Sequence, residues 1–223
     1  MLNLCFDLDD TLYAEADYVR LGRETVAREA AHISHIDIRI LLDVMAGGGN
    51  PFDALYSHLN ASGFEMSVAR MVEIYRFKTH GIEPYPDAIR FLDLMKRNGV
   101  PMTLITDGRS ISQRNKYEDL GLERYIPSER LIISQELGAG KETSLPFVKA
   151  ESLVKARNRI YVADNPAKDF LMPGLMGWTT VAVRSRGGNI HPQRFDDVAP
   201  NCRPHYVIDS FDSLPVILQQ LAL

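Results

Sequence analysis

The stretch CFDLDDTLY, residues 5–13, closes a short apolar run with three aspartates, Asp7, Asp9 and Asp10. Residues 2–8 have the length and the nearly continuous apolar character of a strand that is buried on both faces of a parallel sheet. Ligands of open α/β sheets bind just beyond the carboxyl ends of the strands. The aspartates therefore stand where a functional site is expected, although like charges so close together cost folding energy unless a cation compensates.

Alternating strands and helices account for most of the remaining chain. Strands are expected over five further apolar runs, at residues 101–107, 130–135, 159–164, 179–183 and 205–208. The spacing of apolar residues predicts helices over residues 86–98, 110–120, 145–156 and 210–221, with Ser210 as the N-cap of the last. This alternation predicts an α/β fold with a doubly wound, mainly parallel, Rossmann-like sheet.

One long segment interrupts the alternation. Residues 14–84 show no convincing strand, but helical periodicity predicts four helices, over residues 15–33, 35–46, 51–62 and 67–80. We therefore expect two domains. Residues 1–13 and 85–223 would form the α/β core, and residues 14–84 would form an inserted α-helical domain.

Composition limits the class of protein. The 223 residues are 45% hydrophobic and 24% charged with a formal net charge of −4, which is typical of a globular protein and gives no general attraction to nucleic acid or anionic lipid. No apolar run approaches the roughly 18 residues of a membrane helix. The two cysteines, Cys5 and Cys202, form no disulfide framework. We expect a cytoplasmic protein with no nucleic-acid partner and no membrane association.

Polar residues that follow the other strands are expected to converge with Asp7 and Asp9, because the carboxyl ends of parallel strands meet at one edge of a sheet. These residues are, in chain order, Thr106, Asp107 and Gly108 after the second strand, Lys141 between the third and fourth strands, and Asp164 and Asp169 after the fourth.

Several carboxylates at one edge require a cation. Two carboxylates about 4 Å apart repel by roughly 4 kcal/mol at an effective dielectric constant near 20, so Asp7 beside Asp164 would be costly alone. Oxygen ligands without His or Cys in these motifs favour a hard ion, with Mg²⁺ ahead of Ca²⁺ or Zn²⁺. An ion held by few protein ligands keeps positions for water and for a substrate phosphate, which suits phosphoryl transfer.

Taken in order, these motifs resemble those of the haloacid dehalogenase superfamily, most of whose members are Mg²⁺-dependent phosphatases. The Asp-x-Asp-x-Thr motif of that family is similar to residues 7–11, its second motif to residues 104–108, its third to Lys141, and its acidic fourth motif to residues 164–169. This chain departs from the family at KETSLP, where Lys-Pro-Asp-Pro is frequent, and at Ala163, where Gly is frequent. The helical insertion resembles the family's mainly helical cap.

The resemblance implies a chemical role for the acids. Asp7 would be the nucleophile that forms an aspartyl-phosphate, and Asp9 would be the general acid that protonates the leaving oxygen and then the base that activates water. Mg²⁺ would be held by the Asp7 carboxylate, the Asp9 backbone carbonyl and Asp164. Asp10 receives no chemical role, and we expect it to cap the turn that leads into the insertion.

The same resemblance implies how phosphate would be bound. Thr106 would donate to a phosphoryl oxygen, with help from backbone amides near Asp107 and Gly108. Lys141 would neutralise the phosphoryl group and the nucleophile. Asp169 would orient Lys141 or a metal-bound water.

Basic and cap residues complete the expectations. Arg109 is expected to meet an anionic substrate, whereas Arg114 and Lys116 are expected on the exposed surface of their helix. Contacts from the insertion that would give specificity are expected among Tyr13, Arg20, Arg23, His58 and Arg76.

We therefore expect a Mg²⁺-dependent phosphatase that acts on a small phosphomonoester, such as a sugar phosphate. Two alternatives stay open. A phosphomutase acting on sugar phosphates would share all four motifs, and a catalytically silent binding protein could use the same scaffold, although the intact pair Asp7 and Asp9 argues against it. The sequence indicates no oligomeric state.

Overall fold

The computed structural model describes residues 2–78 and 80–221. The chain divides into two compact units, one made of Met1–Ala16 with Glu83–Leu223 and the other made of Asp17–Ile82. The first unit contains the sheet, and the second consists of helices and the loops that join them.

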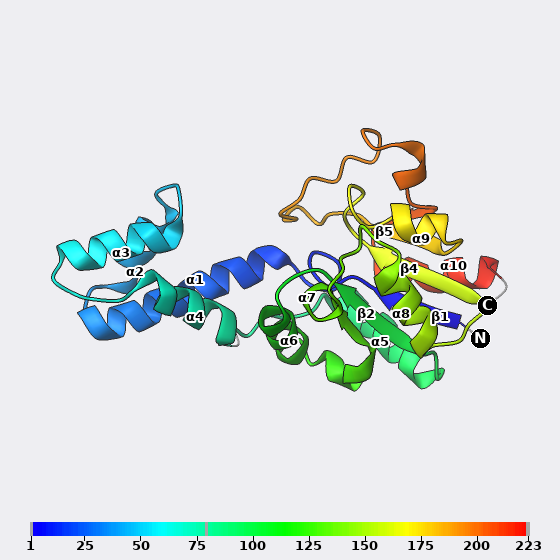
Figure 1. Cartoon of the computed structure of the whole chain (residues 1–223), viewed down its shortest axis with the longest axis horizontal. Helices are drawn as coiled ribbons and strands as arrows, with labels where there is room; N and C mark the ends of the chain where they lie inside the picture. Colours follow the sequence, from blue (N-terminus) through cyan, green and yellow to red (C-terminus); the bar gives the residue numbers. More distant parts are fainter. Residues whose placement is uncertain (1, 79, 222–223) are drawn as a thin grey trace. The chain divides into compact units, whose positions relative to one another are not determined.

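Six parallel strands form one sheet in the order β3-β2-β1-β4-β5-β6 (Figure 1). The strands are β1 Leu2–Phe6, β2 Met102–Thr106, β3 Leu131–Ile133, β4 Asn158–Ala163, β5 Thr179–Val183 and β6 Tyr206–Ile208. Each strand overlaps one of the predicted apolar runs, and only β4 extends beyond its run, by one residue at Asn158. The pairing confirms the doubly wound, Rossmann-like α/β sheet.

The strand order reverses at β1. The chain continues from β1 to β2 and β3 on one side, and then returns to β4, β5 and β6 on the other. Phe6 therefore lies opposite both Leu104 of β2 and Val162 of β4. The residue after Phe6 falls at the topological switch point, where open α/β sheets bind their ligands.

Aromatic side chains cover both faces of the sheet. On one face, Phe147 makes edge-on contacts with Tyr161 and Trp178, with ring centroids 5.2 Å and 5.6 Å away. On the other face, Phe6 meets Phe91 edge-on at 6.3 Å. Because both faces are buried, the strands are nearly continuously apolar, and only their ends are free to carry polar residues.

The helices of the first unit are α5 Pro86–Arg97, α6 Ser110–Asp119, α7 Ser134–Leu137, α8 Leu145–Leu153, α9 Leu171–Leu175 and α10 Leu214–Gln220. Short 3-10 turns lie at Leu122–Arg124, Ser128–Arg130, Pro200–Cys202 and Phe211–Ser213. The prediction over residues 210–221 is wrong at its start. The Ser210 hydroxyl accepts from the N–H of Asp212 and caps a 3-10 turn, and α10 begins only at Leu214.

The second unit contains α2 Ile38–Ala46, α3 Pro51–Ala61, α4 Val68–Phe77 and most of α1 Glu15–Ser34. Its buried cluster includes Val26, Leu41, Leu55 and Met71. The helix predicted over 67–80 has Ser67 as its N-cap and ends at Phe77, while residue 79 lies outside the described residues. Within residues 2–78 and 80–221, none of the helices combines the length and the apolarity needed to cross a membrane.

Candidate active site

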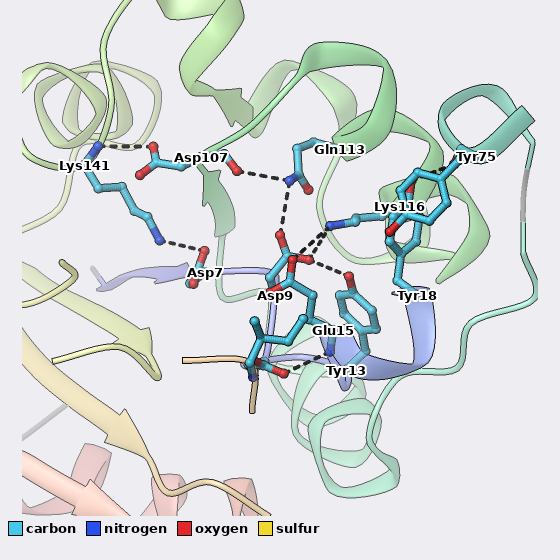
Figure 2. Close-up of polar contacts among 12 residues, drawn as sticks. Asp7, Asp9, Tyr13, Glu15, Tyr18, Tyr75, Asp107, Gln113, Lys116 and Lys141 are labelled. Atoms are coloured by element: carbon cyan, nitrogen blue, oxygen red, sulfur yellow. Dashed lines mark hydrogen bonds and ion pairs between the residues drawn. The ribbon is translucent and has the colours of Figure 1, made fainter. Parts of the chain in front are cut away.

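Asp7 extends the pairing of β1 by one residue. Its N–H donates to the carbonyl of Val162 at 2.9 Å, and the residue is only 5% exposed. Its Oδ1 lies 2.9 Å from Nζ of Lys141, which comes from the loop between α7 and α8 (Figure 2). The same Nζ lies 2.6 Å from Oδ1 of Asp169. One buried ammonium thus joins two buried carboxylates.

Three carboxylates gather around this ammonium. Asp7, Asp164 and Asp169 each place an oxygen within 4.8 Å of the other two. Burial raises the pKa of Asp164 to about 7, and the charge of Asp169 adds to the rise. Burial also raises the pKa of Asp7 well above its usual range, although Lys141 acts in the opposite direction. One lysine therefore does not neutralise the cluster, and a further cation would lower its energy. The donor set consists of carboxylate oxygens, which fit a hard divalent ion.

The segments after β4 and β5 hold these acids in place. The N–H of Asn165 donates to Oδ2 of Asp169 at 2.9 Å, so the turn that Asn165 starts also fixes this acid. The loop after β5 brings Asn189, whose Nδ2 donates to Oδ2 of Asp164 at 2.7 Å, and Gln193, whose Nε2 donates to the Asp164 carbonyl at 2.8 Å. Sequence reasoning missed this loop entirely.

The carboxylate of Asp10 holds two backbone segments by hydrogen bonds. The backbone of Asp10 has a positive φ of 54°. Its Oδ1 accepts from the N–H of Glu15, the first residue of α1, at 2.9 Å, and its Oδ2 accepts from the N–H of Ile190 at 2.8 Å. The hydrogen bond to Glu15 agrees with the prediction that Asp10 caps the turn into the insertion. The hydrogen bond to Ile190, in the loop after β5, was not predicted.

The end of β2 presents a hydroxyl and a carboxylate. Oγ1 of Thr106 is buried and has no hydrogen-bond partner among the described residues. Oδ1 of Asp107 accepts from the backbone N–H of Lys141 at 3.2 Å. The sequence predicted that backbone amides near Asp107 and Gly108 help to bind phosphate. The N–H of Gly108 instead donates to Oγ of Ser134 at 2.9 Å.

These residues surround a cavity of about 130 Å³. It is lined by Asp7, Asp9, Asp10, Glu15, Thr106, Asp107, Lys141, Asp164, Asn165, Lys168, Asp169 and His191. Of the residues to which the four motifs assign a catalytic, phosphate-binding, metal-binding or supporting role, only Gly108 is missing from this lining, whereas none of the predicted specificity contacts belongs to it. Lys168 and His191 are additional lining residues that the motifs did not single out.

Asp9 is held by three donors (Figure 2). Its Oδ1 lies 2.6 Å from Nζ of Lys116 and accepts from the Tyr13 hydroxyl, and its Oδ2 accepts from Nε2 of Gln113 at 3.1 Å. Burial alone would raise the pKa of Asp9, but Lys116 and these hydrogen bonds hold it below its usual range. Tyr13, expected as a substrate contact, is instead fully buried against Asp9.

The expectation that Lys116 decorates an exposed helix surface is wrong. Lys116 is 4% exposed and lies on the same face of α6 as Gln113 and Tyr117, both buried. The buried Leu120 continues this spacing of three and four residues, which is the signal in the sequence that could have identified the face. Arg109, expected to meet substrate, is exposed at the N-cap of α6.

The remaining residues suggested as specificity contacts, Arg20, Arg23, His58 and Arg76, belong to the second unit. Arg20 forms exposed ion pairs there with Asp17 and Glu24, each at 3.0 Å.

The sheet carries acids, a lysine and a buried hydroxyl at its switch point, a set of groups that can bind and attack a phosphoryl group. The sequence profile of the haloacid dehalogenase-like hydrolases matches residues 2–173. The chain belongs to this family.

Relatives named as phosphatases match nearly the whole chain. It is 28% identical to the glyceraldehyde 3-phosphate phosphatase of Methanopyrus kandleri, over 97% of each chain. It is 25% identical to the ribulose-1,5-bisphosphate 5-phosphatase of Halopiger xanaduensis, over 95% of this chain and 84% of that protein. The crystal structure of a haloacid dehalogenase phosphatase from Thermococcus onnurineus shares the fold with a TM-score of 0.62 and 19% identity, over 98% of each chain.

Proposed function

We propose that the chain is a phosphatase that hydrolyses a small sugar phosphate through an aspartyl-phosphate on Asp7. The observation that carries the proposal is the bridge of Lys141 between Asp7 and Asp169 in a cavity that Thr106 also lines. A phosphoryl group there would meet a nucleophile, a cation and an unsatisfied hydroxyl donor. The relatives named as phosphatases of glyceraldehyde 3-phosphate and ribulose 1,5-bisphosphate support the substrate class.

We also propose Mg²⁺ as the cofactor, held by the carboxylates of Asp7 and Asp164 with the Asp9 carbonyl. The three clustered carboxylates and the raised pKa of Asp164, caused by burial and by Asp169, support a divalent ion at this place. When bound, the ion would supply positive charge to the phosphoryl oxygens. Asp169 would keep Lys141 oriented.

The residues of the chain would then act in two steps. In the first, a carboxylate oxygen of Asp7 bonds to phosphorus, the bond to the leaving oxygen breaks, and Asp9 gives that oxygen a proton. In the second, water bonds to phosphorus while Asp9 takes its proton, and the bond to Asp7 breaks to release inorganic phosphate. Throughout, Lys141 and Thr106 would stabilise the charge on the phosphoryl oxygens.

The test is a phosphate-release assay with Mg²⁺ on a panel that contains glyceraldehyde 3-phosphate, ribulose 1,5-bisphosphate and an aryl phosphate. We expect turnover of at least one sugar phosphate and no turnover by Asp7→Asn, with Glu118→Gln, an exposed acid of α6, as the matched control. Full activity of Asp7→Asn or in excess chelator would overturn the mechanism. A wild type that isomerises the sugar phosphates would be a mutase, and one that binds them without turnover would be a silent binding protein.

A further inference from the structure

The carboxyl group of Asp9 is fixed from α6. Nζ of Lys116 lies 2.6 Å from Oδ1 of Asp9 and 3.9 Å from Oε1 of Glu15. Asp9 and Glu15 line the cavity, but Lys116 does not. Figure 2 shows dashed lines from the ammonium to both carboxylates. Lys116 can therefore influence the reaction only through its neighbours.

The second oxygen of Asp9 is fixed by the same helix. Nε2 of Gln113, one turn before Lys116, donates to Oδ2 of Asp9 at 3.1 Å and to the carbonyl of Asp107 at 3.0 Å. A Cβ on Gly108 would lie 2.5 Å from this Nε2. Glycine at position 108 therefore leaves the room that Gln113 needs to reach Asp9.

Counting acceptor positions distinguishes the two oxygens of Asp9. A carboxylate oxygen accepts about two hydrogen bonds. Oδ1 has two donors, Lys116 and the Tyr13 hydroxyl, whereas Oδ2 has one, Gln113, among the described residues. A proton shared with a substrate would therefore reside on Oδ2, and Lys116 occupies the oxygen that does not take part.

We propose that Lys116 is a positioning residue that fixes Asp9 so that Oδ2 is the oxygen that delivers the proton to the leaving group. The inference rests on the proposed function, in which Asp9 is the general acid. In this step Oδ2 gives up its proton as the bond between phosphorus and the leaving oxygen breaks, and the product is an alcohol.

Leaving groups of different acidity test this role, because a sugar or glycerol oxygen must be protonated as it departs, whereas p-nitrophenolate leaves as an anion. General-acid catalysis is worth roughly 100-fold to 10,000-fold. For Lys116→Met we therefore expect kcat/KM on glycerol phosphate to fall at least tenfold more than kcat/KM on p-nitrophenyl phosphate. The comparison uses kcat/KM because it ends at leaving-group departure and omits the later hydrolysis of Asp7.

Three further variants separate positioning from loss of structure. Asp9→Asn should show the same bias, and the double variant Lys116→Met with Asp9→Asn should lose no more than Asp9→Asn alone, since Lys116 acts through Asp9. Lys149→Met, a change at an exposed lysine of α8, should show no bias. If Lys116→Met does not fold by circular dichroism, Gln113→Leu replaces it, with the same bias expected.

The outcomes distinguish the inference from the proposed function. Equal losses on both substrates in a folded Lys116→Met or Gln113→Leu variant, or an added loss in the double variant, would overturn the positioning role. A wild type that hydrolyses neither substrate, nor any sugar phosphate of the panel, would overturn the proposed function itself.

Discussion

Removing one charge from the acidic cluster should stabilise the metal-free protein while abolishing its activity. We choose Asp164→Asn, because an asparagine oxygen can still accept from Nδ2 of Asn189, which lies 2.7 Å from Oδ2 of Asp164. The substitution removes a buried carboxylate whose neighbours include Asp7 and Asp169. What changes is therefore the charge at this position, with little change in shape.

The magnitude follows from the pKa of Asp164, which burial and Asp169 raise from 3.8 to about 7. Since each pKa unit is worth about 1.4 kcal/mol, the ionised carboxylate destabilises the metal-free fold by up to roughly 4 kcal/mol at pH 8. Because the pKa of Asp164 is higher in the folded than in the unfolded protein, ionisation of this acid lowers the free energy of unfolding. The penalty is complete above pH 7 and shrinks as the pH falls toward the unfolded value.

Urea unfolding in EDTA measures this effect. At pH 8 we expect Asp164→Asn to be more stable than the wild type by about 2 to 4 kcal/mol, and at pH 5 by less than half of that. Added Mg²⁺ should stabilise the wild type and leave Asp164→Asn unchanged, because a ligand stabilises only the state that binds it. Glu118→Gln, at an exposed acid, should change stability by less than about 0.5 kcal/mol. A metal-free Asp164→Asn no more stable than the wild type at pH 8 would refute the electrostatic reasoning.

Three other substitutions test how neighbouring groups support the site. Asn189→Leu should weaken Mg²⁺ binding by roughly 10-fold to 100-fold in isothermal titration calorimetry, because it removes the donor that orients Asp164; unchanged affinity would show that the contact is dispensable. Asp10→Ala leaves the N–H groups of Glu15 and Ile190 without their acceptor and should lower the free energy of unfolding by roughly 1 to 3 kcal/mol in urea. Gly108→Ala, at a φ of 145° and with its Cβ in the space of Gln113, should lower kcat/KM on glycerol phosphate more than on p-nitrophenyl phosphate, and equal losses would argue against a role for Gln113.

The sequence predicts the sheet well because burial on both faces leaves an uninterrupted apolar signal. Each predicted run overlaps one observed strand. The residues at the strand ends could also be predicted, since parallel strands deliver their carboxyl ends to one edge whatever their order. Asp7, Thr106, Lys141 and Asp164 accordingly line one cavity.

The sequence could not reveal contacts that depend on how a helix or a loop is oriented in the folded chain. Lys116 and Asp9 meet because one face of α6 turns toward the end of β1. The spacing of three and four residues along α6 can identify the buried face, but it does not indicate that Asp9 is the partner of Lys116. Asn189 lies in a loop without periodicity, and its contact with Asp164 depends on the path of that loop across the strand ends. A buried lysine on a mostly polar helix also lacks the apolar signature that normally marks a packed face.

The pairing of β1 with β4 has a consequence for biosynthesis. Residue 7 emerges from the ribosome long before residue 164, with the whole helical unit between them, and at roughly 5 to 20 residues per second the interval is about 8 to 30 seconds. During that time β1 can pair with β2, which carries no carboxylate of the acidic cluster. The electrostatic cost of bringing three acids together therefore arises only when β4 docks beside β1, after much of the hydrophobic sheet is already available to offset it.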